Sequence, residues 1–137
     1  MTVIADTGPL YALIDKSDAW HSRVVTWWLE RARNVVVPAA ILPEVSYLLQ
    51  TRIGPAAEQA FIRAVADGDF TVEALEPEDI ERAATLLHDY ADLPLGFVDA
   101  TVVATAERLG VRDILTTDRR HFSVIRPLHA KSLVLLP

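Results

Sequence analysis

The sequence predicts a single α/β domain over residues 1–137, with a central parallel sheet of about five strands and helices on both faces. The main observation is that short apolar runs alternate along the chain with longer segments in which apolar residues recur at helical spacing. A hydrophobic content of 51% in 137 residues supplies enough apolar material for one core. Strands that alternate with helices are joined by right-handed crossovers, which make the strands parallel and place the helices against the sheet.

The expected strands are short apolar runs that end at polar or turn-forming residues. The first run is followed by Asp6 and the turn sequence at 7–9, the second is bounded by Pro38, and the fourth ends at Asp118. The five runs are residues 2–5, 35–37, 70–72, 114–117 and 133–136.

The expected helices carry apolar residues three or four positions apart. Asp18 is expected to cap the second helix, Pro43 and Pro77 fit a helix only in its first turn, and Gly110 ends the last helix. The six segments are residues 10–14, 18–28, 41–50, 56–66, 77–91 and 97–109.

Composition excludes several classes of protein. Cysteine is absent, which excludes a disulfide framework, a cysteine-based zinc site and a catalytic cysteine. No apolar stretch approaches the roughly 20 residues of a membrane span, and Met1 leads directly into a strand-like run without a basic segment. We therefore expect a soluble cytoplasmic protein with no membrane contact.

The charge distribution argues against a simple basic nucleic-acid binder, because the net charge is −6. Residues 1–66 hold six acids and six bases, residues 67–99 hold ten acids and one base, and residues 100–137 hold three acids and six bases. Part of the acidic segment opens the helix at Pro77, where acids in the first turn interact favourably with the helix dipole. The last segment leaves a basic region near the end of the chain.

Four acidic residues are expected at one edge of the sheet. Asp6 ends the first strand, Asp118 ends the fourth, Glu44 lies one turn into the helix after the second, and Asp99 lies in the first turn of the helix over 97–109. The carboxyl ends of parallel strands share one edge, and ligand sites in such sheets form there. The sequence therefore predicts that four carboxylates converge.

Converging carboxylates repel one another and raise each other's pKa values, so such a cluster is stable with a cation between them. Oxygen ligands favour Mg²⁺ or Mn²⁺, and these ions commonly take phosphate oxygens as further ligands. Thr7, Thr116 and Thr117 lie near the strand ends, but no histidine is placed in sequence to activate them as nucleophiles. Hydrolysis of a phosphodiester by in-line attack of water is the simpler chemistry.

Each acid also has a structural interpretation when taken alone. Asp6 could cap the following helix, Asp99 could serve only the helix dipole, Glu44 could face solvent, and Asp118 could be a turn residue. Two other enzyme classes are excluded: a haloacid-dehalogenase-type phosphatase needs a second carboxylate where Gly8 stands, and residues 7–9 cannot supply a dinucleotide-binding glycine motif. Only the four acids together favour a catalytic site.

Four segments of the chain resemble the PIN-domain ribonucleases and, more narrowly, the VapC toxins of bacterial type II toxin–antitoxin modules. The segments are VIADTGPLYALID at 3–15, VPAAILPEVSYLL at 37–49, LPLGFVDATVVATAERLG at 93–110 and ILTTDRRHF at 114–122. The resemblance covers essentially the whole chain and retains all four acids. One departure is Gly8, where many relatives carry serine, so Thr7 is the hydroxyl residue left to support the site.

The resemblance implies a PIN domain over residues 1–137 that acts as a Mg²⁺- or Mn²⁺-dependent endoribonuclease. It implies that Asp6 and Asp99 are the principal metal ligands and that Glu44 and Asp118 complete the site and position the attacking water. It also implies a homodimer that is silenced by a cognate VapB antitoxin in a heterotetramer or larger assembly. The implied substrate is tRNA or a structured loop of ribosomal RNA, whose cleavage inhibits translation. The alternative is a catalytically inactive PIN-like module that binds RNA or a partner.

Two further groups of residues are candidate interaction sites. Arg119, Arg120 and His121 directly follow Asp118, and we expect them to contact unpaired RNA beside the acidic site, although they could equally be a solvated loop.

Three tryptophans at helical spacing are more often core or interface anchors than base-stacking platforms, and we expect an interface with a partner or antitoxin. These are Trp20, Trp27 and Trp28.

Overall fold

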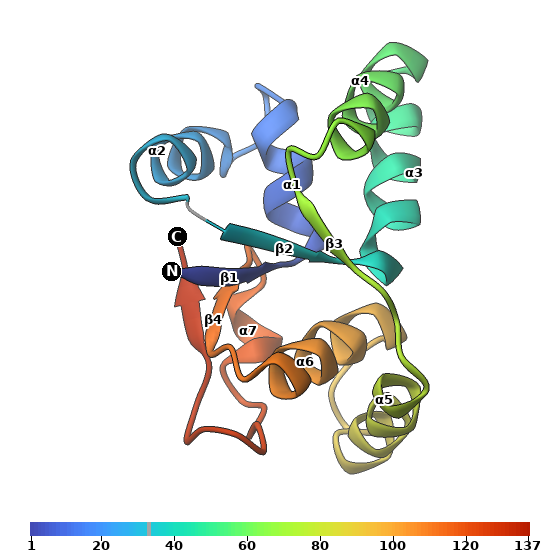
Figure 1. The fold of residues 1–137 in the computed structure, drawn as a ribbon, viewed down its shortest axis with the longest axis vertical. Coiled ribbons are helices and arrows are strands. Elements are labelled where there is room, and N and C mark those ends of the chain that lie inside the picture. The colour runs from blue at the N-terminus through green and yellow to red at the C-terminus, as the bar shows by residue number, and fades with distance from the viewer. Residues whose placement is uncertain (33) are drawn as a thin grey trace.

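A computed structural model describes residues 1–32 and 34–137, which form a five-stranded sheet (Figure 1). All strands are parallel, in the order β3-β2-β1-β4-β5. They are β1 (Thr2–Ala5), β2 (Asn34–Pro38), β3 (Thr71–Glu73), β4 (Asp113–Leu115) and β5 (Val134–Leu136). The parallel sheet of about five strands expected from the sequence is therefore confirmed.

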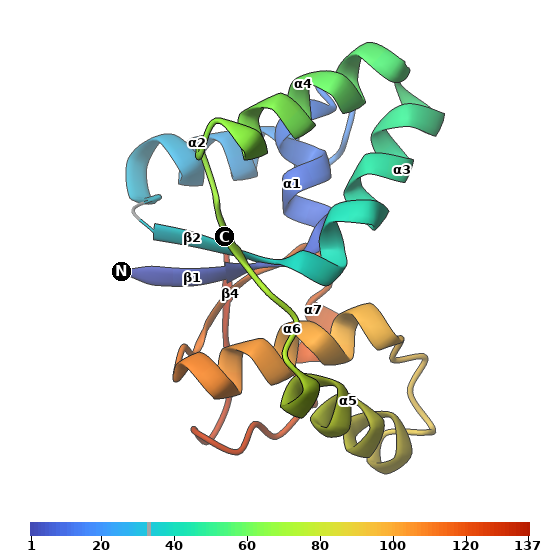
Figure 2. The same cartoon turned by 45° about the vertical axis from the view of Figure 1, so that its right-hand side comes forward.

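Helices cover both faces of this sheet, as Figure 2 shows. One face carries α1 (Thr7–Ile14), α2 (His21–Arg31), α3 (Leu42–Arg52) and α4 (Pro55–Ala66). The other carries α5 (Pro77–Asp89), α6 (Phe97–Leu109) and α7 (Arg119–Phe122). A 3₁₀ turn over Ala39–Ile41 joins β2 to α3. The expected three layers are confirmed.

Strand β1 lies at the centre of the sheet and determines where the site forms. Val3 pairs with Val35 of β2, and Ile4 pairs with Ile114 of β4. These residues are buried because helices cover both faces, which explains why the strand is continuously apolar rather than alternating. Asp6, which directly follows this strand, is therefore held at the middle of the carboxyl edge.

Helix α6 is the most deeply buried helix, since residues 100–106 are all buried between the sheet and α5. It begins after Gly96 and ends at Gly110, whose φ of 68° is a left-handed conformation that favours glycine. Packing along the whole helix fixes its first turn, and Asp99 lies in that turn. The position of this carboxylate is therefore set by the core.

Several boundaries differ from those expected. Residues 119–122 form α7 rather than a loop, because the Asp118 carboxylate caps their backbone, and β4 ends at Leu115. Asp18 does not cap α2: its carboxylate accepts a hydrogen bond from Trp20 N at 2.8 Å in the turn that precedes the helix. Residues 7–9 are the first turn of α1 rather than a separate turn.

Much of the acidic segment serves the packing of α5 against α6. Asp79 of α5 is 1% exposed, and both of its oxygens accept hydrogen bonds from Arg108 of α6. Arg108 also binds Glu73 at the end of β3, at 2.8 Å. Arg82 of α5 pairs with Glu107 of α6 at 2.7 Å. These partly buried pairs connect β3, α5 and α6 and hold α6 in place.

Within residues 1–32 and 34–137, no helix has both the length and the hydropathy needed to cross a membrane.

Candidate active site

The structure brings the four predicted acidic residues together at the carboxyl edge of the sheet. Burial is the main cause that raises the pKa of Asp6, Glu44 and Asp99. In addition, the charges of Asp99 and Glu44 raise the pKa of Asp6, the charge of Asp99 raises that of Glu44, and the charge of Asp118 raises that of Asp99. Such effects need short distances between the carboxylates. The structure therefore places ligand atoms of Asp99 and Asp118 within 4.8 Å of each other and of His121, and it places Asp6 and Glu44 near enough to interact electrostatically with Asp99.

Asp6 is the most deeply buried member of the cluster, at 5% exposure. Burial raises the pKa of its carboxyl to about 7, and hydrogen bonds from the Thr7 backbone and the Thr116 hydroxyl act in the opposite direction. Its side chain makes no capping bond to the following helix, so the structural interpretation of Asp6 as a helix cap is not supported. Ionisation of a carboxyl group buried this deeply costs folding free energy unless a positive charge lies next to the carboxylate.

Thr116 links two of the acids, a role that the sequence reasoning missed. Its hydroxyl donates to Asp6 Oδ2 at 3.0 Å and accepts from the backbone N–H of Asp118 at 2.9 Å. The side chain is fully buried at the end of β4. A threonine directly after a buried strand and two residues before an acid is the only signal in the sequence, and threonines are common in such positions.

Asp99 lies at the start of α6, where its Oδ2 accepts a hydrogen bond from Gly96 N at 3.4 Å. Burial raises the pKa of its carboxyl, and the nearby Asp118 raises it further. The bond to Gly96 and the position in the first turn are the helix-capping role expected of such an acid. Asp99 therefore has both a structural role and a place in the cluster.

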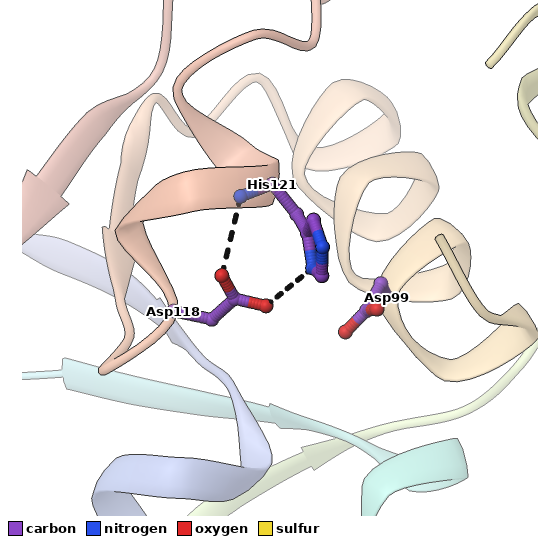
Figure 3. Close-up of side chains that lie close together, drawn as sticks. All are labelled: Asp99, Asp118 and His121. Carbon is purple, nitrogen blue, oxygen red and sulfur yellow. Dashed lines mark hydrogen bonds and ion pairs between the residues drawn. The ribbon is translucent and has the colours of Figure 1, made fainter. Parts of the chain in front are cut away.

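Asp118 and His121 form a pair at the start of α7 (Figure 3). Asp118 Oδ1 accepts from the backbone N–H of His121 at 3.2 Å, and Oδ2 lies 2.6 Å from His121 Nδ1. One ligand atom each from Asp99, Asp118 and His121 lie within 4.8 Å of one another. His121 was expected on an RNA-binding surface, but its imidazole faces the acidic cluster.

Glu44 and Thr7 lie on the other side of the cluster. Glu44 stands in the first turn of α3, and partial burial together with the charge of Asp99 raises its pKa. The Thr7 hydroxyl is close enough to Glu44 to favour its charged form. Thr7 Oγ1 is buried and makes no hydrogen bond of normal length within the described residues.

This donor set fits a divalent cation. Asp99, Asp118 and His121 each offer a ligand atom within 4.8 Å of the other two. Asp6 and Glu44, whose pKa values are raised, interact electrostatically with Asp99, and the buried Thr7 hydroxyl lies near Glu44. Carboxylate and hydroxyl oxygens are the ligands that Mg²⁺ and Mn²⁺ take in proteins. A cation would also relieve the mutual repulsion that burial imposes on the carboxylates.

Gly8 lies against Thr117 next to the cluster. A Cβ atom at residue 8 would stand 2.1 Å from Thr117 Oγ1 and 3.3 Å from Thr117 Cβ. The Thr117 hydroxyl therefore fills the space that a side chain at residue 8 would need. The hydroxyl that is absent at residue 8 is thus replaced in space by one from the strand-end segment.

The two arginines of α7 have different surroundings. The Arg119 guanidinium donates to the carbonyl of Pro137 and stacks over the Trp20 ring at 5.9 Å, so it is engaged within the chain. Arg120 is exposed, and its guanidinium has no ion pair or hydrogen bond within the described residues. Of the two, Arg120 is the cation that remains available beside the acidic site.

The tryptophans also differ from one another. Trp27 is 5% exposed and packs in the core, so the expected interface role is wrong for this residue. Trp28 is only partly buried and packs edge-on against Trp27 and Phe70. Helical spacing placed all three tryptophans on α2 or its start, but only the packing of α2 against the sheet decides which one is covered.

Residues 3–126 match the PIN domain family, and the chain therefore belongs to this family. It is 36% identical over 135 residues to Ribonuclease VapC26 of Mycobacterium tuberculosis, a match that covers 98% of this chain and 100% of the relative. This relative identifies the chain more narrowly as one of the VapC group, as the motifs suggested.

Solved structures share the fold. Mycobacterium tuberculosis VapC20, described as a Sarcin-Ricin loop cleaving toxin, has a TM-score of 0.81 at 24% identity, covering 86% of this chain and 91% of that chain. A toxin-antitoxin complex from Klebsiella pneumoniae has a TM-score of 0.70 at 20% identity, with coverage of 90% and 92%. VapBC2 from Rickettsia felis, bound to a DNA fragment from its promoter, has a TM-score of 0.69 at 14% identity, with coverage of 98% and 97%.

The raised pKa of Asp6 predicts how stability changes with pH. Without metal, the folded state binds the Asp6 proton up to about pH 7, whereas the unfolded state releases it near 3.8, so stability falls as pH rises between these values. Asp6→Asn removes this loss, and Asn can still accept from Thr116. We expect the variant to be more stable than wild type by about 2–4 kcal/mol at pH 8 and by under about 1 kcal/mol at pH 4. Urea unfolding in EDTA measures this, and an effect independent of pH would contradict it.

The two hydrogen bonds of Thr116 predict a role in metal binding. Thr116→Val keeps the shape of the side chain but removes the donor to Asp6 and the acceptor for Asp118 N. We expect Mn²⁺ affinity, measured by calorimetry, to fall about 10- to 100-fold, as for other groups that orient metal ligands. Thr116→Ser is the matched control, because it keeps the hydroxyl. Equal affinity of the valine variant and wild type would show that Thr116 does not orient the site.

Proposed function

We propose that this chain is the toxin of a type II toxin–antitoxin module of the VapBC kind, built as one PIN domain over residues 1–137. In this proposal it acts in the cytoplasm as a divalent-metal-dependent endoribonuclease that inhibits translation. The observation that carries the proposal is the convergence of Asp6, Glu44, Asp99 and Asp118 around a buried unpartnered hydroxyl. Its relationship to Ribonuclease VapC26 supports RNA as the substrate.

The proposed reaction is hydrolysis of an RNA phosphodiester. The oxygen of water bonds to phosphorus, the bond to the 3′-oxygen breaks, and the products carry a 5′-phosphate and a 3′-hydroxyl. A divalent cation, when bound, supplies positive charge that stabilises the pentacovalent transition state and promotes deprotonation of the attacking water. This chemistry needs no covalent nucleophile, in keeping with a site whose reactive groups are carboxylates.

The residues of the site divide this work between them. Asp6 and Asp99 are proposed to hold the cation, since one is fixed by the central strand and the other by the buried helix α6. Glu44 stands at the exposed side of the cluster and is proposed to orient the attacking water and accept its proton. Asp118 is proposed to complete the site, held by the Thr116 hydroxyl through its backbone N–H.

RNA approaches a protein of net charge −6, so local positive charge is needed for phosphate contact. Arg120 is proposed to supply it, since this guanidinium is exposed beside Asp118 and has no partner within the described residues. Phe97, 45% exposed at the start of α6, offers an aromatic face two residues from Asp99. Exposed aromatic and arginine side chains stack on unpaired bases, which favours a loop of tRNA or ribosomal RNA over a duplex.

Membership of the VapC group indicates a VapB antitoxin as the partner, and structures with the same fold include toxin-antitoxin complexes. The chain has an apolar cavity of about 510 Å³ between α1, α2 and α4, lined among others by Ile14, Trp28, Phe61 and Phe70. We propose that apolar side chains of the antitoxin occupy it, which gives Trp28 the interface role expected for the tryptophans. We also propose that the toxin is a homodimer and that the complex is a heterotetramer or larger.

The alternative function, a catalytically inactive module that binds RNA or a partner, is not favoured. A binding module has no need of four repelling carboxylates in a partly dry site, because removing them would stabilise the fold. All four acids are present, and their supporting hydrogen bonds from Thr116 and Gly96 are in place.

The catalytic proposal predicts metal-dependent cleavage of RNA. The purified, antitoxin-free protein is incubated with total RNA from its host in Mg²⁺, in Mn²⁺ and in EDTA, and new ends are mapped. We expect discrete cuts with 5′-phosphates in the presence of metal, none in EDTA, and a loss of about 10²-fold or more in Asp99→Asn. A 2′-deoxy nucleotide at the cut site is expected to leave cleavage intact. A 2′,3′-cyclic phosphate product, or cutting by folded Asp99→Asn at the wild-type rate, would refute the mechanism.

Arg120 predicts a separate effect on substrate binding. Arg120→Ala is expected to raise KM for RNA several-fold with kcat changed less than about twofold, since phosphate contact contributes to binding before and during the reaction. The slope of log affinity against log salt is expected to become shallower by about 0.7, the contribution of one phosphate contact on single-stranded RNA. Lys16→Ala is the control, because Lys16 is exposed beyond the far end of α1. Equal effects in both variants would argue against a specific contact.

A further inference from the structure

His121 is placed among the acids as a ligand would be. One ring nitrogen of His121 and one oxygen each of Asp99 and Asp118 lie within 4.8 Å of one another. Figure 3 shows both carboxylates pointing into the space beside the imidazole. Ligand atoms on an octahedral ion at about 2.1 Å lie about 3 Å apart when adjacent and about 4.2 Å apart when opposite. The three side chains can therefore reach one ion with small adjustments.

The imidazole is held in this orientation. Asp118 binds both the backbone N–H of His121 and its Nδ1, and the His121 side chain is 17% exposed. Nε2 has no hydrogen-bond partner within residues 1–32 and 34–137. A carboxylate that holds one ring nitrogen while the other remains free is the usual arrangement around a histidine that ligates a metal.

A second observation, independent of these hydrogen bonds, indicates that the cluster takes a bound group. Thr7 is 5% exposed, and its hydroxyl lies near Glu44 without a hydrogen-bond partner in the described part of the chain. Burying an unpaired hydroxyl costs free energy unless a ligand satisfies it. Thr7 directly follows Asp6 and its hydroxyl lies near Glu44, and both of these acids interact with Asp99, so the unpartnered hydroxyl belongs to the same carboxylate cluster.

We propose that a ring nitrogen of His121 is a direct ligand of the divalent ion beside Asp99, with Asp118 orienting the ring, and that the site therefore binds Mn²⁺ in preference to Mg²⁺. This inference rests on the proposed function, since it concerns the ion of the same site. It assigns His121 to the metal rather than to RNA, and Asp118 to the support of His121.

The nitrogen ligand determines the choice of ion. Mg²⁺ takes oxygen ligands almost exclusively and keeps several of its waters. Imidazole suits transition metals rather than Mg²⁺. Mn²⁺ takes the same carboxylate and water oxygens as Mg²⁺ but is a transition-metal ion, so an added imidazole ligand favours Mn²⁺ over Mg²⁺. A site with carboxylates alone would give little discrimination between these two ions, whereas one imidazole ligand shifts the balance to Mn²⁺.

The test measures the ligand directly on the metal-bound protein without RNA. Pulsed electron paramagnetic resonance of the Mn²⁺-loaded full chain detects a nitrogen nucleus coupled to the ion, and ¹⁵N-labelled histidine identifies its source. The variants are His121→Asn, which keeps an amide near the Nδ1 position but lacks Nε2, and His88→Asn, an exposed histidine on α5 as the matched control. Mn²⁺ and Mg²⁺ affinities are measured on the same samples, and thermal unfolding checks that each is folded.

We expect a histidine nitrogen coupling in wild type and in His88→Asn and its loss in His121→Asn. We also expect Mn²⁺ affinity to fall about tenfold or more in His121→Asn while Mg²⁺ affinity changes less than about threefold, so that the preference is lost. Wild-type protein that binds Mn²⁺ without a histidine coupling overturns the inference, and so does a coupling that persists in His121→Asn. If His121→Asn does not fold, the labelled wild-type spectrum and His121→Gln decide the question.

Failure of the proposed function gives a different result. If wild type binds neither ion, or if Asp99→Asn binds both ions as tightly as wild type does, the metal-dependent nuclease itself is wrong. If wild type cuts RNA with metal but shows no histidine coupling, the nuclease stands and only the assignment of His121 is overturned.

Discussion

Burial of negative charge at one edge of the sheet is the constraint on which the rest of the structure depends. Asp6 is almost completely buried and interacts with Asp99 and Glu44, so the fold must offset repulsion and desolvation at once. Each acid is placed at the start of a helix: Asp6 precedes α1, Glu44 and Asp99 lie in the first turns of α3 and α6, and Asp118 caps α7. The positive ends of these helices face the carboxylates and lower the cost of keeping them together.

The pattern of charge in the sequence has a different meaning once the fold is known. Part of the acidic stretch over residues 67–99 was expected only to interact with the dipole of the helix that begins at Pro77, but Asp79 is buried and paired with Arg108. Arg108, the base that neutralises Asp79, comes from α6, which also presents Asp99 to the site. The ion pairs of α5 therefore support the position of a site residue at the other end of the neighbouring helix.

The sequence was sufficient for the parallel sheet and for the four acids, because both follow from local patterns. Alternating strands and helices admit few topologies, and acids directly after strands must lie at one edge. The sequence was not sufficient where contacts between distant segments decide the outcome. The four-residue helix α7 depends on the Asp118 carboxylate, and the inward position of His121 follows from that cap. The hydrogen bond of Thr116 to Asp6 and the burial of Trp27 become visible only in the folded structure. The residues beside them in the chain do not distinguish Thr116 from Thr117 or Trp27 from Trp28.

The close approach of Gly8 and Thr117 ties together two positions that are far apart in the chain. A side chain added at residue 8 would occupy the volume that the Thr117 hydroxyl now fills. Threonine therefore fits at residue 117 in its present conformation because residue 8 is glycine. A larger residue at position 8 therefore requires the Thr117 side chain to shift or to be replaced by a smaller one, whereas Thr117 can be made smaller with Gly8 unchanged. The order of substitution matters for this reason, and protein engineers who enlarge residue 8 should vary residue 117 in the same library.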